Sequence, residues 1–326
     1  SDTHQIVVDA ALLHAPLNSR KSSPMPTPLF PFTGGKRRLA EAITARFPKI
    51  ITSYCEPFCG GAAVLGHLDT RAHGIHVLLT DADPDLMDLY EAVRRLPMET
   101  LTEARRVCHS IRGDFAGWYR LRDEWNASPR PRSAGMQLAV RSLTWNGTWR
   151  HNKKGEMNLP PVDKIDSHRL PSEETVMAWH VLLNEHRQAP SLTGSVTLSR
   201  WDIRHYRDFV NGGTQDKVSE WCGEGRPESV VYMDPPYMAP EGKKGVEYLA
   251  AGFNLEDQKW TLRLARALDQ KGHHVVWSNA NLASSRALLE EWWPEAKVDK
   301  LTVHRSVAAD KLARGDAPEL IAYSAR

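Results

Sequence analysis

The chain has 326 residues, of which 41% are hydrophobic and 25% are charged, and its formal net charge at pH 7 is +2. This composition is typical of an ordinary soluble globular protein, and the small net charge means that any basic surface must be local. No apolar run approaches the roughly 20 residues of a membrane-spanning helix, so we expect no membrane partner. The four cysteines follow no paired metal-ligand or disulfide spacing, which favours a cytoplasmic protein with no metal site.

The first part of the chain is predicted to lie outside the folded body. Residues 18–31 are rich in Ser, Pro and basic side chains, a composition that is typical of a linker. We therefore interpret residues 1–27 as an N-terminal extension and linker, and we expect the folded domain to begin at residue 28.

Strand-like and helical patterns alternate in two separate parts of the chain. Buried strands are predicted at residues 51–55, 76–80, 229–233 and 274–278. Amphipathic helices are predicted at residues 36–45, 84–95, 255–271 and 283–293. This alternation indicates an α/β fold with a doubly wound sheet, in which ligands bind at the carboxyl ends of the strands.

The alternation is interrupted between residues 96 and 195. This stretch is polar, rich in Trp and Arg, and carries its own helical patterns, so we interpret it as an inserted, mostly helical domain. The surrounding domain would then comprise residues 28–95 and 196–326. Within the insertion, residues 125–155 contain no Asp or Glu. Their six basic residues are Arg130, Arg132, Arg141, Arg150, Lys153 and Lys154, which predict a local basic patch.

The most informative motif is Asp234-Pro235-Pro236-Tyr237, which directly follows the predicted strand 229–233. An amino group on an adenine or cytosine ring is a weak nucleophile because its lone pair is delocalised into the ring. The Asp234 carboxylate and the Pro235 carbonyl could each accept one N–H bond and make that nitrogen more nucleophilic. The two prolines fix the backbone, and Tyr237 offers a ring on which a flipped-out base could stack.

A second motif follows the predicted strand 51–55. Residues 56–63, Glu-Pro-Phe-Cys-Gly-Gly-Ala-Ala, are small enough to let the backbone approach a ligand before the chain turns. Asp81 lies about 20 residues further on, at the end of the next predicted strand, where an acidic residue typically binds ribose hydroxyls. The alternative is that Asp81 caps the following helix, a role that Asp83 or Pro84 could also fill.

A third glycine-containing segment precedes both. Residues 32–36, Phe-Thr-Gly-Gly-Lys, resemble part of a phosphate-binding loop. They lack the upstream glycine and the Ser or Thr after the lysine that such a loop requires, so we reject nucleoside triphosphate binding.

These motifs together resemble the Dam-type adenine-N6 DNA methyltransferases, the D12 class or alpha group. The order in that family is a GGK motif, the EPF-x-GG loop, an acidic strand end, an inserted target-recognition domain and DPPY. Trp145-Asn146-Gly147 and Ser278-Asn279 also match family segments. The resemblance begins near residue 28 and extends to the C-terminus, and it departs from the family pattern at Ala62, where a glycine is usual.

The resemblance implies a Rossmann-like methyltransferase sheet and S-adenosylmethionine as cofactor, with S-adenosylhomocysteine as product. It assigns the target adenine to Asp234, Pro235, Pro236 and Tyr237. It assigns the cofactor to Phe32, Lys36, Phe58, Gly60, Ala62, Asp81, Asp202, Ile203 and Asp234.

The inserted segment is where a DNA sequence would be recognised. Arg150, Asn152, Lys153 and Lys154 lie beside the turn-forming residues Asn146-Gly147 and Gly155, which suggests a hairpin or loop that enters a groove. Arginine can pair with guanine and asparagine with adenine, whereas the lysines more often contact phosphates. Lys243 and Lys244 belong to a second candidate DNA-binding loop, after Tyr237.

The sequence therefore predicts an enzyme that methylates the N6 of a flipped-out adenine in double-stranded DNA, acting as a monomer. Two alternatives keep the chemistry and change the substrate, namely adenine in structured RNA and the N4 amino group of cytosine in DNA. A catalytically inactive DNA-binding protein on the same fold is a third alternative, which the intact motifs disfavour.

Overall fold

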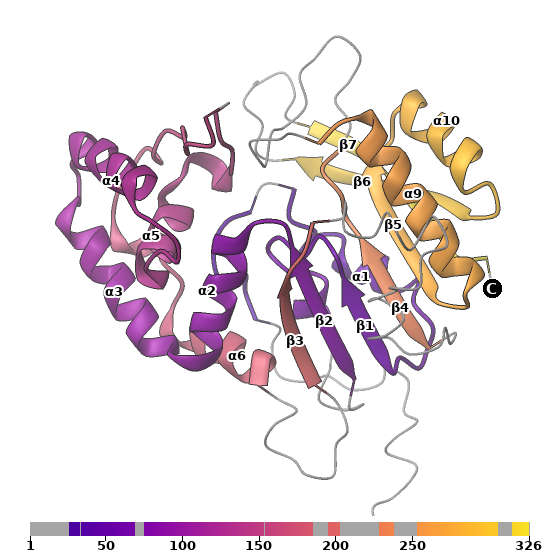
Figure 1. Cartoon of the computed structure of the whole chain (residues 1–326), viewed down its shortest axis with the longest axis horizontal. Coiled ribbons are helices and arrows are strands. Elements are labelled where there is room, and N and C mark those ends of the chain that lie inside the picture. Colours follow the sequence, from indigo (N-terminus) through magenta and orange to yellow (C-terminus); the bar gives the residue numbers. More distant parts are fainter. Residues whose placement is uncertain are drawn as a thin grey trace, which may run out of the picture.

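The computed structural model describes residues 26–32, 34–68, 75–152, 154–184, 195–202, 228–237, 253–305 and 315–325. The chain forms an α/β body that is built on a mixed sheet. A group of helices, α3, α4 and α5, lies to one side of this body (Figure 1). Within the described ranges, no helix has the length and apolar character needed to cross a membrane.

The sheet that the structure describes has seven strands in the order β3-β2-β1-β4-β5-β7-β6. The strands are β1 (Ser53–Glu56), β2 (His76–Asp81), β3 (Ser195–Arg200), β4 (Ser229–Met233), β5 (His274–Ala280), β6 (Lys297–Arg305) and β7 (Gly315–Tyr323). Strands β1 to β5 pair in parallel, and β7 is antiparallel to both β5 and β6. The chain order reverses between β1 and β4, which makes the carboxyl ends of these two strands the expected ligand crevice.

Both faces of the sheet are covered, and β4 shows how the sequence achieves this. Its residues are buried on alternate sides: Val230 and Tyr232 join one core cluster, and Val231 and Met233 join the other. The first cluster contains residues of α1 (Ala40–Thr44) and α2 (Pro84–Arg95), and the second contains residues of α9 (Leu255–Gln270) and α10 (Ala283–Trp292). A strand buried on both faces reads as a continuous apolar run, which explains why SVVYM predicted a strand.

The helix boundaries follow from local capping. Asp83 is the N-cap of α2, where its side chain accepts hydrogen bonds from the backbone N–H groups of Asp85 and Leu86, and Pro84 occupies the first helical turn. Asn254 and Asp257 form a reciprocal capping box at the start of α9. The predicted helices 84–95, 255–271 and 283–293 are confirmed to within one residue, whereas the helix predicted at 36–45 is confined to Ala40–Thr44.

The predicted α/β fold with a Rossmann-like sheet is confirmed. All four predicted strands are present, with ends that differ by at most two residues. Strands β3, β6 and β7 were not predicted by the sequence patterns.

The insertion is helical in its described part. It contains α3 (Pro97–Ser110), α4 (Phe115–Ala127), α5 (Ala134–Leu143) and α6 (Glu173–Asn184), and it enters after α2 and leaves before β3. Helices α3, α5 and α6 contact α2, which therefore connects the insertion to the sheet. At Gly147, with φ +63°, an added Cβ would lie 2.5 Å from the Pro31 carbonyl carbon, so the insertion touches the backbone next to Phe32.

The predicted basic patch is partly wrong, because three of its six basic side chains pair with acids of α2 and its N-cap. Arg141 Nη2 lies 2.7 Å from Asp83 Oδ2, and Arg132 Nη1 and Arg130 Nη2 lie 2.7 and 3.1 Å from Asp85 Oδ2. These arginines neutralise carboxylates that are themselves buried and attach the insertion to α2. Arg141 and Arg132 present little charge to solvent, whereas Arg130 is 51% exposed.

We expect the Arg141–Asp83 pair to be essential for stability. Both side chains are buried, with 2% and 10% exposure, and the Arg141 guanidinium also stacks 4.0 Å from the centroid of the Trp149 ring. Replacing Arg141 by Met leaves Asp83 as an uncompensated buried charge, which should lower the free energy of unfolding by about 3–5 kcal/mol. Urea denaturation monitored by tryptophan fluorescence measures this loss.

Two further variants make this test specific. The double variant Arg141→Met/Asp83→Asn removes both charges and keeps a capping side chain, so it should recover much of the lost stability. Arg130→Ala is the matched control, since Arg130 is 51% exposed and Arg132 also contacts Asp85; it should cost at most about 1 kcal/mol. If Arg141→Met unfolds at the same urea concentration as the wild type, the Arg141–Asp83 pair is not essential for stability.

Candidate active site

A buried ion pair lies at the end of β4. Asp234 follows Met233 directly, and its Oδ2 lies 2.9 Å from Lys36 Nζ, while its Oδ1 accepts a 2.8 Å hydrogen bond from Ser278 Oγ in β5. Lys36 Nζ also donates to the Gly34 carbonyl at 2.7 Å. Burial raises the pKa of Asp234 above its ordinary value, and the charge and hydrogen bond of Lys36, with the Ser278 hydroxyl, oppose that rise.

The rest of the DPPY motif is held from three sides. The Tyr237 hydroxyl donates to the Glu319 carboxylate in β7, and Lys36 Nζ lies 4.6 Å from the centroid of the Tyr237 ring. Gln258 Nε2, near the start of α9, donates to the Pro236 carbonyl, and Gln258 Oε1 accepts from Asn279 Nδ2 at 3.1 Å. The segment after β4 is therefore fixed by side chains from β5, β7 and α9.

The glycine loop after β1 is tied to the end of β2. Cys59 N donates to the Thr80 carbonyl at 3.0 Å, and Thr80 Oγ1 donates to the Pro57 carbonyl at 3.1 Å. Gly60 and Ala62 both adopt left-handed backbone, with φ +46° at each position. A Cβ added to Gly60 would lie 2.8 Å from the Phe32 ring, so the small residue allows Phe32 to pack against the loop.

Asp81 bridges the glycine loop and the start of α2. Its Oδ2 accepts from Gly60 N and its Oδ1 accepts from Asp83 N, both at 3.0 Å. Because Asp83 is the N-cap of α2, the alternative that Asp81 fills that role is wrong. Burial raises the pKa of Asp81 to about 6, against the lowering effect of its backbone hydrogen bonds.

Two more of the residues assigned to the cofactor, Phe58 and Asp202, lie after strands β1 and β3. Phe58, in the glycine loop, packs edge-on against Phe253, with ring centroids 6.1 Å apart. Asp202 follows β3, and the preceding Trp201 donates its backbone N–H to the Asp81 carbonyl at 2.9 Å, which places Asp202 near the end of β2. The expectation for Ile203 falls outside the described residues.

The arrangement suits transfer to a weak nucleophile more than covalent catalysis. The Asp234 carboxylate is ion-paired with Lys36 and accepts a hydrogen bond from Ser278, so it is held as an oriented acceptor. Oriented acceptors at the end of a buried strand can bind N–H groups and stabilise developing positive charge. Asp81, at the end of β2, offers a second, partly buried carboxylate for a polyhydroxylated ligand.

The predicted DNA-reading segment forms a tight hairpin. His151 and Met157 make an antiparallel bridge, and Asn152 N donates to the Glu156 carbonyl at 2.8 Å. The Asn152 side chain is engaged within this turn: its Oδ1 accepts from the backbone N–H groups of Lys154 and Glu156, and its Nδ2 donates to Glu156 Oε2. Asn152 thus holds the hairpin in shape. The expectations for Lys153, Lys243 and Lys244 fall outside the described residues.

Arg150 lies at the base of this hairpin. Its Nε donates to Asn158 Oδ1 at 3.1 Å on the opposite strand, and the side chain is exposed. Lys154 is also exposed, at the tip. These two cations, unlike Arg132 and Arg141, remain accessible to a polyanion.

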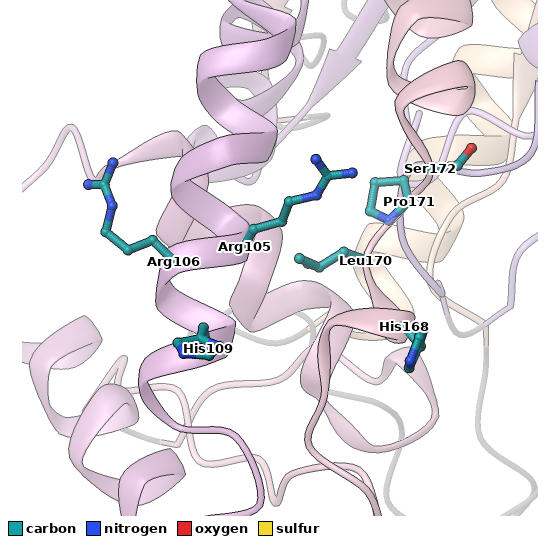
Figure 2. A pocket seen from close by; sticks show the side chains of 7 residues that line it. All are labelled: Arg105, Arg106, His109, His168, Leu170, Pro171 and Ser172. Atoms are coloured by element: carbon teal, nitrogen blue, oxygen red, sulfur yellow. The ribbon is translucent and has the colours of Figure 1, made fainter.

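A pocket of about 660 Å³ lies in the insertion, away from these residues (Figure 2). Its lining comprises Arg105, Arg106, His109, His168, Leu170, Pro171 and Ser172. Arg105 is already paired with Glu173, and none of the lining residues was assigned to the cofactor or the base. In the described part of the chain, no group of three or more His, Cys, Asp or Glu residues is placed to hold a metal ion.

Sequence reasoning missed three residues that hold the DPPY segment. Ser278 matches a family segment, but its bond to Asp234 was not predicted. Gln258 sits one turn inside a helix with no distinguishing pattern, and Glu319 lies in a strand that was not predicted. No signal in a single sequence connects either residue to a motif more than 20 positions away.

Comparison with known proteins identifies the relatives of this chain. Residues 32–180 match the family model of the D12 class N6 adenine-specific DNA methyltransferases. The type II methyltransferase M.MjaIII of Methanocaldococcus jannaschii is 27% identical over 272 residues, 78% of this chain and 84% of that protein. The DNA adenine methylases of Serratia marcescens and Escherichia coli K12 are 27% and 26% identical over 89% of this chain, and over 96% and 92% of their own lengths.

A solved structure, the rRNA methyltransferase aviRa from Streptomyces viridochromogenes, aligns with 97% of this chain and 90% of its own at 16% identity and a TM-score of 0.39. That similarity is too low to add to the argument. The sequence relatives carry more weight, because a match over 89% of the chain includes both halves of the sheet as well as the insertion. The resemblance to the D12 class is confirmed.

The two left-handed residues of the glycine loop give a matched prediction. Gly60→Ala should lower the free energy of unfolding by at least about 1 kcal/mol, because an L residue at φ +46° is strained and its Cβ forces the Phe32 ring to move. Ala62→Gly relieves the same strain but loses a buried methyl group and gains unfolded-state entropy, so its net change should stay within about 1 kcal/mol. Thermal denaturation of both variants measures the difference, and equal destabilisation by both would contradict this reading.

Proposed function

We propose that this chain, whose residues 32–180 match the D12 class of N6 adenine-specific DNA methyltransferases, transfers a methyl group from S-adenosylmethionine to the exocyclic N6 of adenine in DNA. The observation that carries the proposal is the Asp234 carboxylate, which is held by Lys36 and Ser278 at the start of DPPY. It lies where the chain order of the sheet reverses, between β1 and β4.

The proposed chemistry depends on which hydrogen-bond acceptors of the DPPY segment are available to the amino group of the base. Gln258 occupies the Pro236 carbonyl, so we assign the Pro235 carbonyl and the Asp234 carboxylate to the two N–H groups of the adenine amino group. Two acceptors that are both out of the ring plane draw the nitrogen toward sp³ geometry and localise its lone pair. Lys36 keeps Asp234 ionised in a buried setting, which preserves its capacity to accept.

The residues on the other side of the crevice fit the proposed cofactor, which supplies a methyl group on a positively charged sulfur. Each Asp81 oxygen accepts one backbone N–H, and a carboxylate oxygen can accept a second bond, so the ribose hydroxyls can donate to Asp81. Lys36 Nζ has three protons, of which two are engaged, and the third can bind the methionine carboxylate. Phe32, Phe58, Gly60, Ala62, Asp202 and Ile203 complete the assigned pocket.

The DNA side of the proposal rests on the insertion. We assign residues 96–195 to target recognition, with Arg150 and Lys154 on the accessible hairpin and with Lys153, Lys243 and Lys244 as further contacts. Double-stranded DNA is the proposed partner and a monomer the proposed acting unit, with no metal involved. The alternatives of adenine in RNA and N4 of cytosine are not favoured, because the matching family is specific for N6 of adenine in DNA.

The decisive test of the catalytic assignment compares Asp234→Asn and Asp234→Ala with the wild type. Transfer of labelled methyl groups to unmethylated DNA should fall by at least about 100-fold in both variants, because a charged acceptor in a buried site is lost. Cofactor affinity, measured by calorimetry, should fall by a much smaller factor than the rate, because Asp234 is one of nine residues assigned to the cofactor. Retained turnover in Asp234→Ala would refute the role of this carboxylate.

Cofactor binding should depend on pH through Asp81. The raised pKa of about 6 means that the carboxyl takes up a proton as the pH falls through 6, and the neutral form accepts fewer hydrogen bonds from the ribose. Affinity should therefore be constant above about pH 7 and weaken by up to about tenfold per pH unit below 6. Calorimetric titrations between pH 5 and pH 8 measure this profile.

The matched variant is Asp81→Asn, which cannot ionise. Its affinity should be weaker by about 1–3 kcal/mol at pH 8 and should lose the pH dependence near 6. A flat profile in the wild type, or an unchanged profile in Asp81→Asn, would contradict the assignment of Asp81 to the ribose.

A further inference from the structure

The Tyr237 hydroxyl donates a hydrogen bond to a carboxylate that lies near the C-terminus of the chain. Glu319 lies in β7, is 5% exposed, and accepts the hydrogen bond that the Tyr237 hydroxyl donates. In the antiparallel register of β5 and β7, Glu319 is the partner of Ala280, two residues beyond Ser278. The carboxylate therefore sits at the same edge of the sheet as Asp234 and the DPPY segment.

Burying a charge is costly unless it is paired or hydrogen-bonded, and the hydrogen bond from Tyr237 is one of the interactions that offset this cost for Glu319. On the other side of Tyr237, Lys36 Nζ lies 2.9 Å from Asp234 Oδ2 and 4.6 Å from the Tyr237 ring centroid. The Tyr237 pKa is raised by burial and by the negative charges of Asp234 and Glu319, so the hydroxyl keeps its proton and remains a donor. One end of Tyr237 is thus fixed by Glu319 and one face of its ring lies against Lys36.

A tyrosine that is only tethered at Cα can rotate its ring about two side-chain bonds. Here the phenol oxygen is anchored to Glu319 in β7, which fixes the direction of the ring axis, and Lys36 over one face of the ring restricts its rotation about that axis. A base that stacks on a fixed ring loses less freedom on binding than one that must order the ring as well. The Pro236 carbonyl, held by Gln258, fixes the backbone just before the ring in the same way.

We propose that Glu319 is a positioning residue for the target base, which orients the Tyr237 ring so that a flipped-out adenine stacks with its amino group at Asp234. The inference rests on the proposed function and adds a residue that the motifs do not include. In this proposal Glu319 acts on the base through Tyr237 and not by direct contact.

The experiment is a double-mutant cycle on Glu319 and Tyr237, measured on DNA whose methylated position has first been mapped with the wild type. Glu319→Ala and Tyr237→Phe each remove the hydrogen bond and keep the ring, so each should lower kcat/KM for DNA by roughly 10- to 100-fold. The double variant should lose no more than the worse single variant, because both changes remove one interaction. Glu319→Gln keeps an acceptor at the same distance and should retain most of the activity.

A spectroscopic signal separates positioning from a merely structural effect. With 2-aminopurine at the mapped adenine position, the fluorescence intensity reports whether the base has left the stack of the duplex and stacks on the enzyme instead. Glu319→Ala should change the intensity of the bound state, while cofactor affinity stays at the wild-type value. The control is Glu291→Ala, which removes an exposed carboxylate on α10 and should leave all readouts unchanged.

The outcomes distinguish the two proposals. If the wild type methylates DNA but Glu319→Ala and Tyr237→Phe both retain wild-type kcat/KM, or their losses multiply in the double variant, the positioning role is overturned and the proposed function stands. If the wild type leaves DNA unmethylated, both proposals fall. Should Glu319→Ala fail to fold, Tyr237→Phe and Glu319→Gln carry the same test.

Discussion

The contact between Lys36 and Asp234 joins three parts of the chain that must meet for the site to exist. Lys36 comes from the segment before α1, Asp234 from the end of β4, and Ser278, which binds the other carboxylate oxygen, from β5. Burial raises the pKa of Asp234 and the Lys36 charge and the Ser278 hydroxyl oppose that rise, while a protonated Asp234 would be a weaker acceptor for an amino group. Under the proposed function, the ion pair therefore serves the chemistry as well as the fold.

The acidic stretch between β2 and α2 has a comparable role for the insertion. Asp81 binds the glycine loop, Asp83 caps α2 and pairs with Arg141, and Asp85 pairs with Arg132. Asp83 also donates its backbone N–H to Asp81. The insertion that is proposed to recognise DNA is thus attached, through Asp83, Asp85, Arg132 and Arg141, to the carboxylate that is proposed to bind the cofactor. A shift of the insertion relative to α2 would therefore move Asp83 and, through its backbone hydrogen bond, the Asp81 side chain.

Much of the fold was predictable because its central strands are buried on both faces. SVVYM and HVVWS read as strands from their apolar runs alone, and each ends where a functional side chain begins. Strand β3 was missed because its side chains are only partly buried, and β6 and β7 because charged residues and a proline interrupt their patterns. Missing β7 meant missing Glu319, whose proximity to Tyr237 depends on the antiparallel register with β5.

The candidate site also has parts that the sequence predicts and parts that only the structure shows. Motifs that are continuous in sequence, the glycine loop and DPPY, were found, and Asp81 was found from its spacing. The basic segment was overestimated because a run of arginines says nothing about their partners: Arg141 and Arg132 face acids that lie about 50 residues earlier in the chain. Asn152 was expected to read a base, but its amide closes its own turn. Such pairings are fixed by tertiary packing and not by local spacing.

The most direct measurement is nucleoside mass spectrometry of unmethylated DNA after incubation with the wild-type chain and S-adenosylmethionine, with structured RNA treated in parallel. The account predicts N6-methyladenine in the DNA, no N4-methylcytosine, and no modified nucleoside in the RNA. Unmodified DNA, or methylation confined to cytosine or to RNA, would contradict it.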